Sequence, residues 1–150
     1  MTEFRVDPHV KVLDERVVVR AKRRGLDALV YAPHFTRLPE IESRARAFSD
    51  EELLVVPARE LFTGGWRNRK HILATGLSAP IPDYLTLEAT MRELDRQDAV
   101  VLVPHPEFAT VSLDAADLGR YGDLLHAVEV YNPKHWRRHN DRARALARET

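Results

Sequence analysis

Short apolar runs alternate along the chain with stretches in which apolar residues recur at helical spacing. The runs are four to seven residues long and comprise Phe4 to Asp7, Leu26 to Ala32, Leu53 to Pro57, Ile72 to Leu77 and Ala99 to Pro104. Runs of this length suit strands, and their alternation with helical patterns is typical of repeated βα units around a mostly parallel sheet. The pattern therefore predicts an α/β fold.

The periodic stretches between these runs predict the helices. They cover Val12 to Arg24, Glu40 to Phe48, a segment capped by Thr86 and running to Arg96, Leu113 to Gly119, and Asn140 to Arg148. Gly25 would end the first helix, because glycine tolerates the left-handed conformation that follows a helix. In the last helix, Ala143, Leu146 and Ala147 are expected to face inward.

The remaining apolar segments predict a hairpin and a further strand. Leu53 to Phe62 and His71 to Leu77 would pair across the turn region Thr63-Gly64-Gly65, and His126 to Tyr131 reads as a late strand. The count is six or seven strands, so a barrel built from them is unclosed. Since an exposed strand edge invites pairing, either the last helix covers that edge or copies of the chain associate through it.

Length and composition limit the classes of function. The 150 residues and 44% hydrophobic content suit one domain spanning 1–150. Twenty-three basic residues balance 23 acidic ones, so no overall field attracts nucleic acid or anionic lipid. The absence of cysteine removes disulfides and thiolate ligands. Without a signal core or a long apolar stretch, no membrane association is expected and the cytoplasm is the simplest location.

Five residues that can bind metals lie where these short runs meet polar breaks: His9, His34, Glu60, His71 and His105. Four follow their runs, and chemistry in α/β sheets gathers at the carboxyl ends of strands. His71 precedes its run, but the hairpin would bring it to the same end. Imidazole and carboxylate groups gathered in this way indicate a site for zinc, manganese or iron.

The local sequence supports the assignment of these five residues as metal ligands to different degrees. A proline precedes each of His9, His34 and His105 and would fix the backbone there, although proline can also simply end a strand. Glu60 sits among apolar neighbours, and a buried carboxylate is costly unless it binds a cation or forms a salt bridge, here to Arg59 or Arg69. His105 could also be a hydrogen-bonded structural histidine.

Other polar residues are candidates for supporting roles. Asp7 and Glu129 could accept the second N–H of metal-bound imidazoles, or form ordinary surface ion pairs. His126, His135 and His139 are not expected to be ligands. The loop Trp66-Arg67-Asn68-Arg69-Lys70 could grip phosphate oxygens through Arg69, or be solvated. The arginine-rich segment Lys134 to Arg148 is compatible with RNA contact, but its arginines spread around a helix.

An ordered series of motifs resembles the polymerase and histidinol phosphatase (PHP) superfamily over nearly the whole chain. Asp7-Pro8-His9 resembles the opening motif, and Ala21 to His34 resembles the segment leading to the second. Four further segments resemble the later motifs of the family. They are Val56 to Leu61, which contains Glu60, then His71 to Leu77, Pro104-His105-Pro106, and Val128-Glu129-Val130-Tyr131-Asn132.

The resemblance implies a distorted (β/α)7-type barrel that holds up to three metal ions, usually zinc, manganese or iron, and hydrolyses phosphate esters of small molecules or nucleotides. It implies that Glu60 bridges two metals, that His71 and His105 complete one of these sites, and that His9 contributes to the other. His34 would belong to a third, more exposed site. Glu60 and His105 are then the residues expected to carry catalysis, with Lys11 and Arg69 as contacts for the substrate phosphate.

The chain also departs from the family pattern. Lys11 replaces a second histidine of the opening motif, and Ala32-Pro33-His34 stands where Thr-Asp-His is usual. The closing Asp-x-His motif is absent, so the last strand of the barrel is expected to be missing and the domain to be incomplete at its C-terminus. One metal site with three protein ligands is expected. The alternatives are a non-catalytic PHP-like scaffold for RNA or a protein partner, and a shortened form of a longer enzyme.

Overall fold

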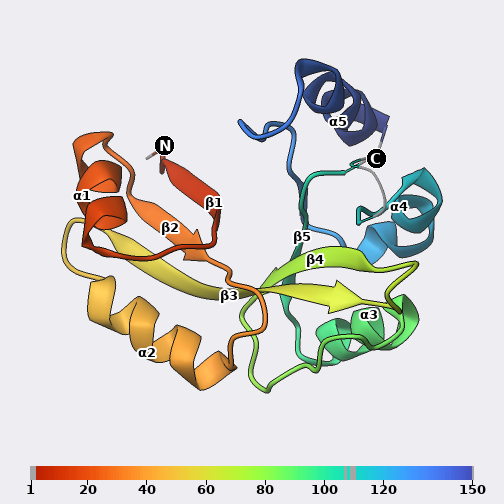
Figure 1. Cartoon of the computed structure of the whole chain (residues 1–150), viewed down its shortest axis with the longest axis horizontal. Helices are drawn as coiled ribbons and strands as arrows, with labels where there is room; N and C mark the ends of the chain where they lie inside the picture. Colours follow the sequence, from red (N-terminus) through yellow and green to blue (C-terminus); the bar gives the residue numbers. More distant parts are fainter. Residues whose placement is uncertain (1–2, 107, 109–110, 150) are drawn as a thin grey trace. The chain divides into compact units, whose positions relative to one another are not determined.

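The computed structural model describes residues 3–106, 108 and 111–149. Figure 1 shows an α/β chain. Its six described strands follow the order β1-β2-β3-β4-β5-β6 in the sheet. The α/β class predicted from the alternating runs is confirmed. The chain forms two compact units, one ending at Glu60 and the other beginning at Leu61, and strand β3 continues from the first unit into the second.

The first unit is built from alternating strands and helices. Its elements are β1 (Val6–Val10), α1 (Glu15–Arg23), β2 (Ala28–Tyr31), α2 (Leu38–Phe48) and the larger part of β3 (Leu54–Thr63). Strand β2 pairs in parallel with both β1 and β3, with Tyr31 opposite Pro57. The carboxyl ends of these three strands therefore lie at one edge.

Helix α1 is fixed at both ends by local chemistry. Asp14 accepts a hydrogen bond from the backbone N–H of Val17 (2.9 Å), so the helix begins at Glu15 rather than at the predicted Val12. Gly25 follows the helix at φ +66°, a conformation that disfavours residues with a Cβ. The predicted end at this glycine is confirmed.

Both helices of this unit pack on the sheet through small and branched residues. The buried cluster consists of Leu13, Ala21, Leu29, Tyr31, Ile41, Ala45, Leu53 and Val55. Strand β1 is more exposed and its register shifts between Asp7 and Val10. Pro8 lies within that shift and has no N–H to donate to a ladder, which explains its place on an edge strand.

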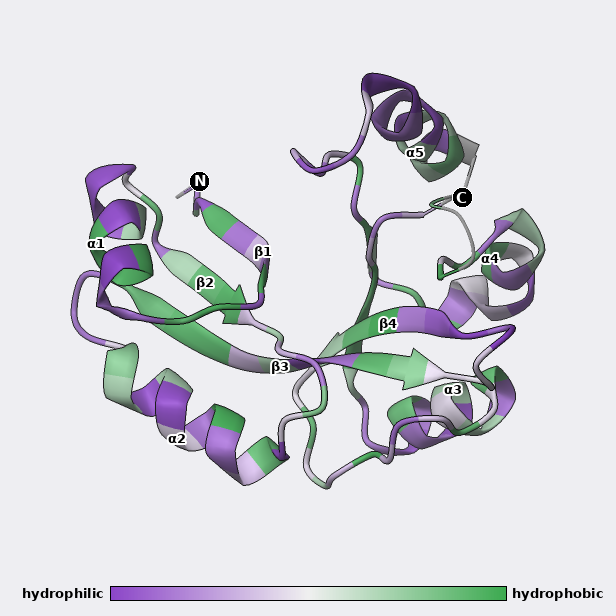
Figure 2. Ribbon diagram, in the orientation of Figure 1, coloured by the Kyte–Doolittle hydropathy of each residue, from purple (hydrophilic) through white to green (hydrophobic). Residues whose placement is uncertain are grey.

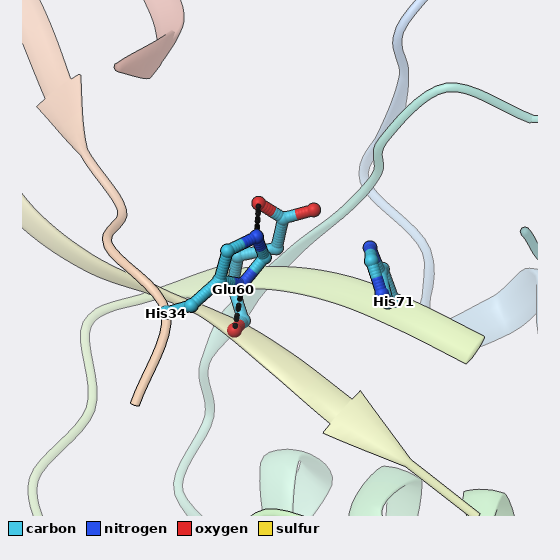
Figure 3. A group of neighbouring side chains, drawn as sticks. All are labelled: His34, Glu60 and His71. Atoms are coloured by element: carbon cyan, nitrogen blue, oxygen red, sulfur yellow. Dashed lines mark hydrogen bonds and ion pairs between the residues drawn. The ribbon is translucent and has the colours of Figure 1, made fainter. Parts of the chain in front are cut away.

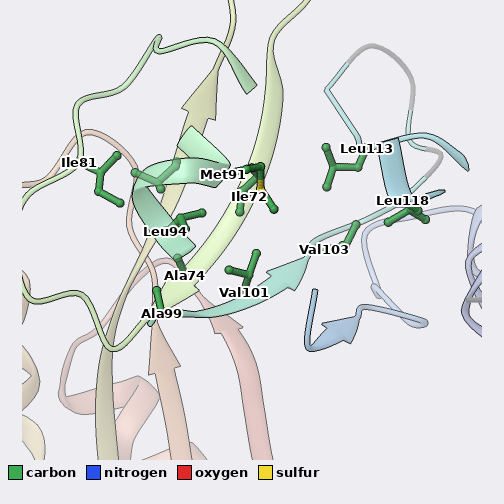
Figure 4. Packing of buried hydrophobic residues seen from close by; sticks show 11 residues of the cluster. Ile72, Ala74, Ile81, Met91, Leu94, Ala99, Val101, Val103, Leu113 and Leu118 are labelled. Carbon is green, nitrogen blue, oxygen red and sulfur yellow. The ribbon is translucent and has the colours of Figure 1, made fainter. Parts of the chain in front are cut away.

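The second unit continues from the end of β3 and has its own core. Its elements are β4 (Lys70–Thr75), α3 (Leu87–Arg96), β5 (Val100–Val103), α4 (Ala115–Tyr121), the 3-10 helix η1 (Gly122–Leu124), β6 (Ala127–Val128) and α5 (Arg137–Glu149). Strand β5 pairs antiparallel with β4 and parallel with β6. Figure 4 shows side chains from α3, α4, β4 and β5 meeting in one buried cluster, which includes Ile72, Met91, Leu94, Val101 and Leu118.

The predicted pairing across Thr63-Gly64-Gly65 is confirmed, because β3 and β4 are neighbours in the sheet. Gly64 has φ +71°, and a Cβ there would lie 2.8 Å from the backbone oxygen of Asn68. The N–H of Gly65 donates to the side-chain oxygen of Asn68 at 2.8 Å. The turn therefore needs glycine at position 64.

Some helices and strands of the second unit begin or end at residues other than those predicted from the sequence. Thr86 caps α3 as predicted. Helix α4 begins at Ala115 rather than Leu113, because Asp114 is its N-cap. The strand expected over His126 to Tyr131 contains only Ala127 and Val128, and helix α5 begins at Arg137, before the expected Asn140. In the described part of the chain, no helix combines the length and apolar character needed to span a bilayer.

Asp114 provides a test of the local chemistry that fixes α4. Its carboxylate accepts the N–H of Asp117 and also pairs with Lys70, and these contacts hold the pKa of Asp114 below its usual 3.8. Asp114→Ala should lower the free energy of unfolding by about 1 kcal/mol at neutral pH. Since a lowered pKa stabilises the fold only while the group is ionised, the difference should shrink below about pH 4.

Denaturant unfolding at several pH values would measure this difference. Asp123→Ala, on exposed η1, is the matched control and should change stability by less than about 0.5 kcal/mol. Equal effects of the two substitutions would contradict the capping role of Asp114.

Candidate functional site

The register of the parallel strands explains how His34 and Glu60 come together. Tyr31 on β2 lies opposite Pro57 on β3, and His34 and Glu60 each follow three residues later. His9 lies on β1 next to Val10, which is paired with Tyr31. His9 therefore lies near the end of β1 and His34 just after β2, as predicted, whereas Glu60 lies within β3, which continues to Thr63 instead of ending with the apolar run at Pro57.

Glu60 is fully buried, and its carboxylate is contacted by three nitrogen atoms. Its Oε2 atom lies 2.9 Å from His9 Nε2, 2.7 Å from Lys11 Nζ and 3.2 Å from His34 Nε2. Figure 3 shows the ring of His34 beside this carboxylate, with its Nδ1 3.4 Å from the backbone oxygen of Glu60. We refer to His9, Lys11, His34 and Glu60 as the Glu60 cluster.

Lys11 is the basic residue of this cluster. Its Nζ lies 2.8 Å from His34 Nε2 as well as 2.7 Å from Glu60 Oε2, and its side chain is 40% exposed. The buried carboxylate thus has an ion pair with Lys11, a partner that the sequence reasoning did not consider. An ammonium group is a hydrogen-bond donor and never a metal ligand while protonated, so Lys11 supplies positive charge rather than coordination.

In the second unit, the pairing of β4 with β5 brings His71 and His105 together. Leu73 lies opposite Leu102, and continuing this antiparallel register puts His71 opposite Pro104, next to His105. The two imidazole rings are 5.3 Å apart between centroids and nearly perpendicular. Both residues are buried, and Phe62 packs on the ring of His71 at 4.1 Å.

His105 is held by contacts on several sides. Its backbone N–H donates to Glu129 Oε2 at 2.6 Å, and its ring Nδ1 lies 3.3 Å from Ser112 Oγ. The backbone has φ +34°, which is strained for a residue with a Cβ. Strain of this kind costs about 1–3 kcal/mol and persists where surrounding contacts impose it. We refer to His71, His105, Ser112 and Glu129 as the His105 cluster.

The donor set fits a divalent metal ion. In the first unit, the Nε2 atoms of His9 and His34 lie 2.9 Å and 3.2 Å from Glu60 Oε2, so two imidazoles and a carboxylate meet at one point. Two imidazoles and a carboxylate are a common ligand set for zinc, manganese and iron. The three residues belong to the five selected from sequence.

Comparison with known proteins supports the fold. Neither protein-family models nor curated proteins gave a match. Among solved structures, the chain is similar to a crystal structure described as "a putative metal-dependent phosphoesterase" from Bifidobacterium adolescentis. The TM-score is 0.66 at 12% sequence identity, over 97% of this chain and 83% of that one. The chain therefore shares the overall fold of that structure.

Two of the residues expected in supporting roles bind the backbone of candidate ligands. Asp7 accepts the backbone N–H of His9 at 3.2 Å, and Glu129 binds the backbone of His105. Arg69 stacks over Trp66, with the guanidinium carbon 4.5 Å from the ring centre. The Nε atom of Arg69 is buried and has no hydrogen-bond partner among the described residues.

Some contacts were missed by sequence reasoning. Ser112 holds both the ring and the backbone of His105, yet nothing in its local sequence distinguishes it. The ring of His135 lies 5.7 Å from that of His105 and stacks on Phe108 at 4.1 Å, although His135 was not expected near the site. The Pro133 that precedes it by two residues was the available signal, because proline-flanked histidines mark the other site segments. His126, in contrast, serves the fold by accepting the N–H of Val101.

Proposed function

We propose that this chain is a metal-dependent hydrolase of phosphate esters. The observation that carries the proposal is the fully buried carboxylate of Glu60 with imidazoles of two strands and Lys11 around it. The fold supports it, because the solved structure with that fold is described as a metal-dependent phosphoesterase. A buried carboxylate that gathers nitrogen ligands is suited to binding a cation.

The proposed ligands in the first unit are His9, His34 and Glu60. The sequence also predicts His71 and His105 as ligands. Zinc, manganese and iron all suit this set. A single ion is favoured over two or three, because Lys11 already brings a positive charge against Glu60 Oε2. A second cation beside the same oxygen would meet electrostatic repulsion.

A bound divalent ion would polarise a phosphoryl oxygen and lower the pKa of a coordinated water molecule. The protein would supply the rest of the chemistry. Glu60 would anchor the ion from a position without solvent, and Ser112 would hold the His105 ring in one orientation. Lys11, which is 40% exposed, would extend its ammonium group towards a substrate phosphate.

The proposed substrate is a small-molecule or nucleotide phosphate ester. Arg69 offers a guanidinium group for phosphate oxygens, and Trp66 beside it is 78% exposed. An exposed indole can stack on a base or another planar group. Location in the cytoplasm and association of copies of the chain through a sheet edge remain predictions of the sequence.

Removing the charge of Glu60 tests the proposal. Glu60→Gln should reduce bound manganese or zinc at least tenfold, because the amide is a neutral and weaker ligand. Hydrolysis of a chromogenic phosphate monoester should fall by about 10²-fold or more. Metal analysis after dialysis and steady-state kinetics would measure the two effects.

Glu88→Gln, an exposed position on α3, is the matched control and should retain both metal and turnover. Metal binding without turnover in the wild-type protein would instead favour the non-catalytic scaffold. Wild-type protein that binds no metal when supplied in excess would contradict the proposal outright.

Lys11 provides a separate test of phosphate binding. If its ammonium group neutralises charge on the substrate, Lys11→Met should lower kcat/KM by about 10²-fold. Lys22→Met is the control, because Lys22 belongs to the same unit and pairs with Asp50 and Glu52 instead. An unchanged kcat/KM in Lys11→Met would show that Lys11 serves only to neutralise Glu60.

A further inference from the structure

One face of helix α1 carries a row of arginines. Arg16, Val19, Arg20 and Arg23 follow the i, i+3, i+4, i+7 spacing that places residues on one side of a helix, and Arg24 forms the C-cap. All five are exposed. The opposite side of the helix carries Ala21, which is buried in the core of the first unit. We refer to these five residues as the α1 arginine face.

The four arginines of this face have no ion-pair or hydrogen-bond partner for their side chains among the described residues. On α3, in contrast, Arg92 binds Glu88 and Arg96 binds Glu93. The whole chain has balanced charge, but four unpaired arginines on one short helix form a local patch of positive charge. Such a patch attracts a polyanion even when the protein as a whole does not.

Helix stability accounts for only part of this arrangement. Arg20 and Arg23 lie in the last turn, where positive charge interacts favourably with the helix dipole. Arg16 lies in the first turn, where the same dipole disfavours a cation. Because Arg16 extends the row against this preference, the row itself requires another explanation.

The side chains of the face also form an open hollow of about 550 Å³, lined by Arg16, Val19, Arg20, Arg23, Arg24 and Glu15. Figure 2 shows hydrophilic residues interleaved with hydrophobic ones along α1. The lining contains one apolar residue and no aromatic ring. A helix that binds a membrane surface has an extended apolar face, and the centre of a protein–protein interface usually has an aromatic anchor. The lining of this hollow has neither feature.

We propose that the α1 arginine face binds the phosphate backbone of a nucleic acid. Guanidinium groups match phosphate oxygens with two parallel hydrogen bonds, and phosphate contacts need no base recognition. Successive arginines on one helix face can contact successive phosphates. This surface lies on one element of the first unit and is independent of the proposed metal site.

Salt-dependent binding tests this proposal. Fluorescence anisotropy with a labelled DNA duplex should give a dissociation constant of about 10⁻⁴ to 10⁻⁶ M at physiological salt. The plot of log K against log salt should have a slope of about −3, corresponding to three or four phosphate contacts. A single-stranded RNA in a parallel titration would show which nucleic acid is preferred.

The variant R16Q/R20Q/R23Q should weaken binding at least tenfold and make the slope shallower by about 2.7, which is about 0.9 for each phosphate contact removed. V19E keeps every arginine and places a negative charge among them, so it should also weaken binding, and glutamate is compatible with a helix. The matched control R92Q/R96Q/R120Q removes the same charge from paired arginines on α3 and α4 and should bind like wild type. Circular dichroism would check that each variant is folded.

Three outcomes would overturn the proposal: no binding by the wild-type chain, an equal loss in the control, or tighter binding of polyglutamate than of either nucleic acid. Glu60→Gln should bind nucleic acid like wild type, whether or not it has lost metal and turnover. Failure of the hydrolase proposal and failure of this one are therefore distinguishable.

Discussion

The buried carboxylate of Glu60 is the constraint on which the site depends. A carboxylate without solvent is expensive unless other groups compensate its charge, and here two imidazoles and an ammonium group contact a single oxygen. The imidazoles that compensate the negative charge of Glu60 also form, together with its carboxylate, a set of metal ligands. Removing any one partner would leave the buried charge less compensated, so stability and metal binding are coupled at this residue.

The pairing register of the strands places the partners of Glu60 near its carboxylate. Parallel pairing sets His34 level with Glu60, and the register shift at Pro8 lies beside His9. In the second unit, antiparallel pairing sets His71 beside His105. Two of the four described non-glycine residues with positive φ are His105 and Phe35, which follows His34, so backbone strain occurs at or next to two candidate ligands. Such strain is common where function, rather than stability, determines a conformation.

Sequence reasoning could find the fold and most of the donor residues because both depend on local patterns. Apolar runs located the strands, and proline-histidine pairs marked their ends. It could not find Ser112 or His135, because their contacts with His105 arise from chain reversals without a local signal. The length of strand β6 was overestimated, because an apolar pattern does not show where hydrogen bonding to the neighbouring strand stops. The ion pair of Lys11 with Glu60 depends on the reach of a long side chain across neighbouring strands.

Glu60 and histidines of this chain are proposed to hold a divalent ion. Anomalous scattering from a crystal soaked in manganese would detect that ion. One strong peak is expected within coordination distance of Glu60, His9 and His34, about 2.0–2.3 Å from each ligand atom. A map with no peak beside Glu60, or with Lys11 still bound to its carboxylate and the ion elsewhere, would rule this site out.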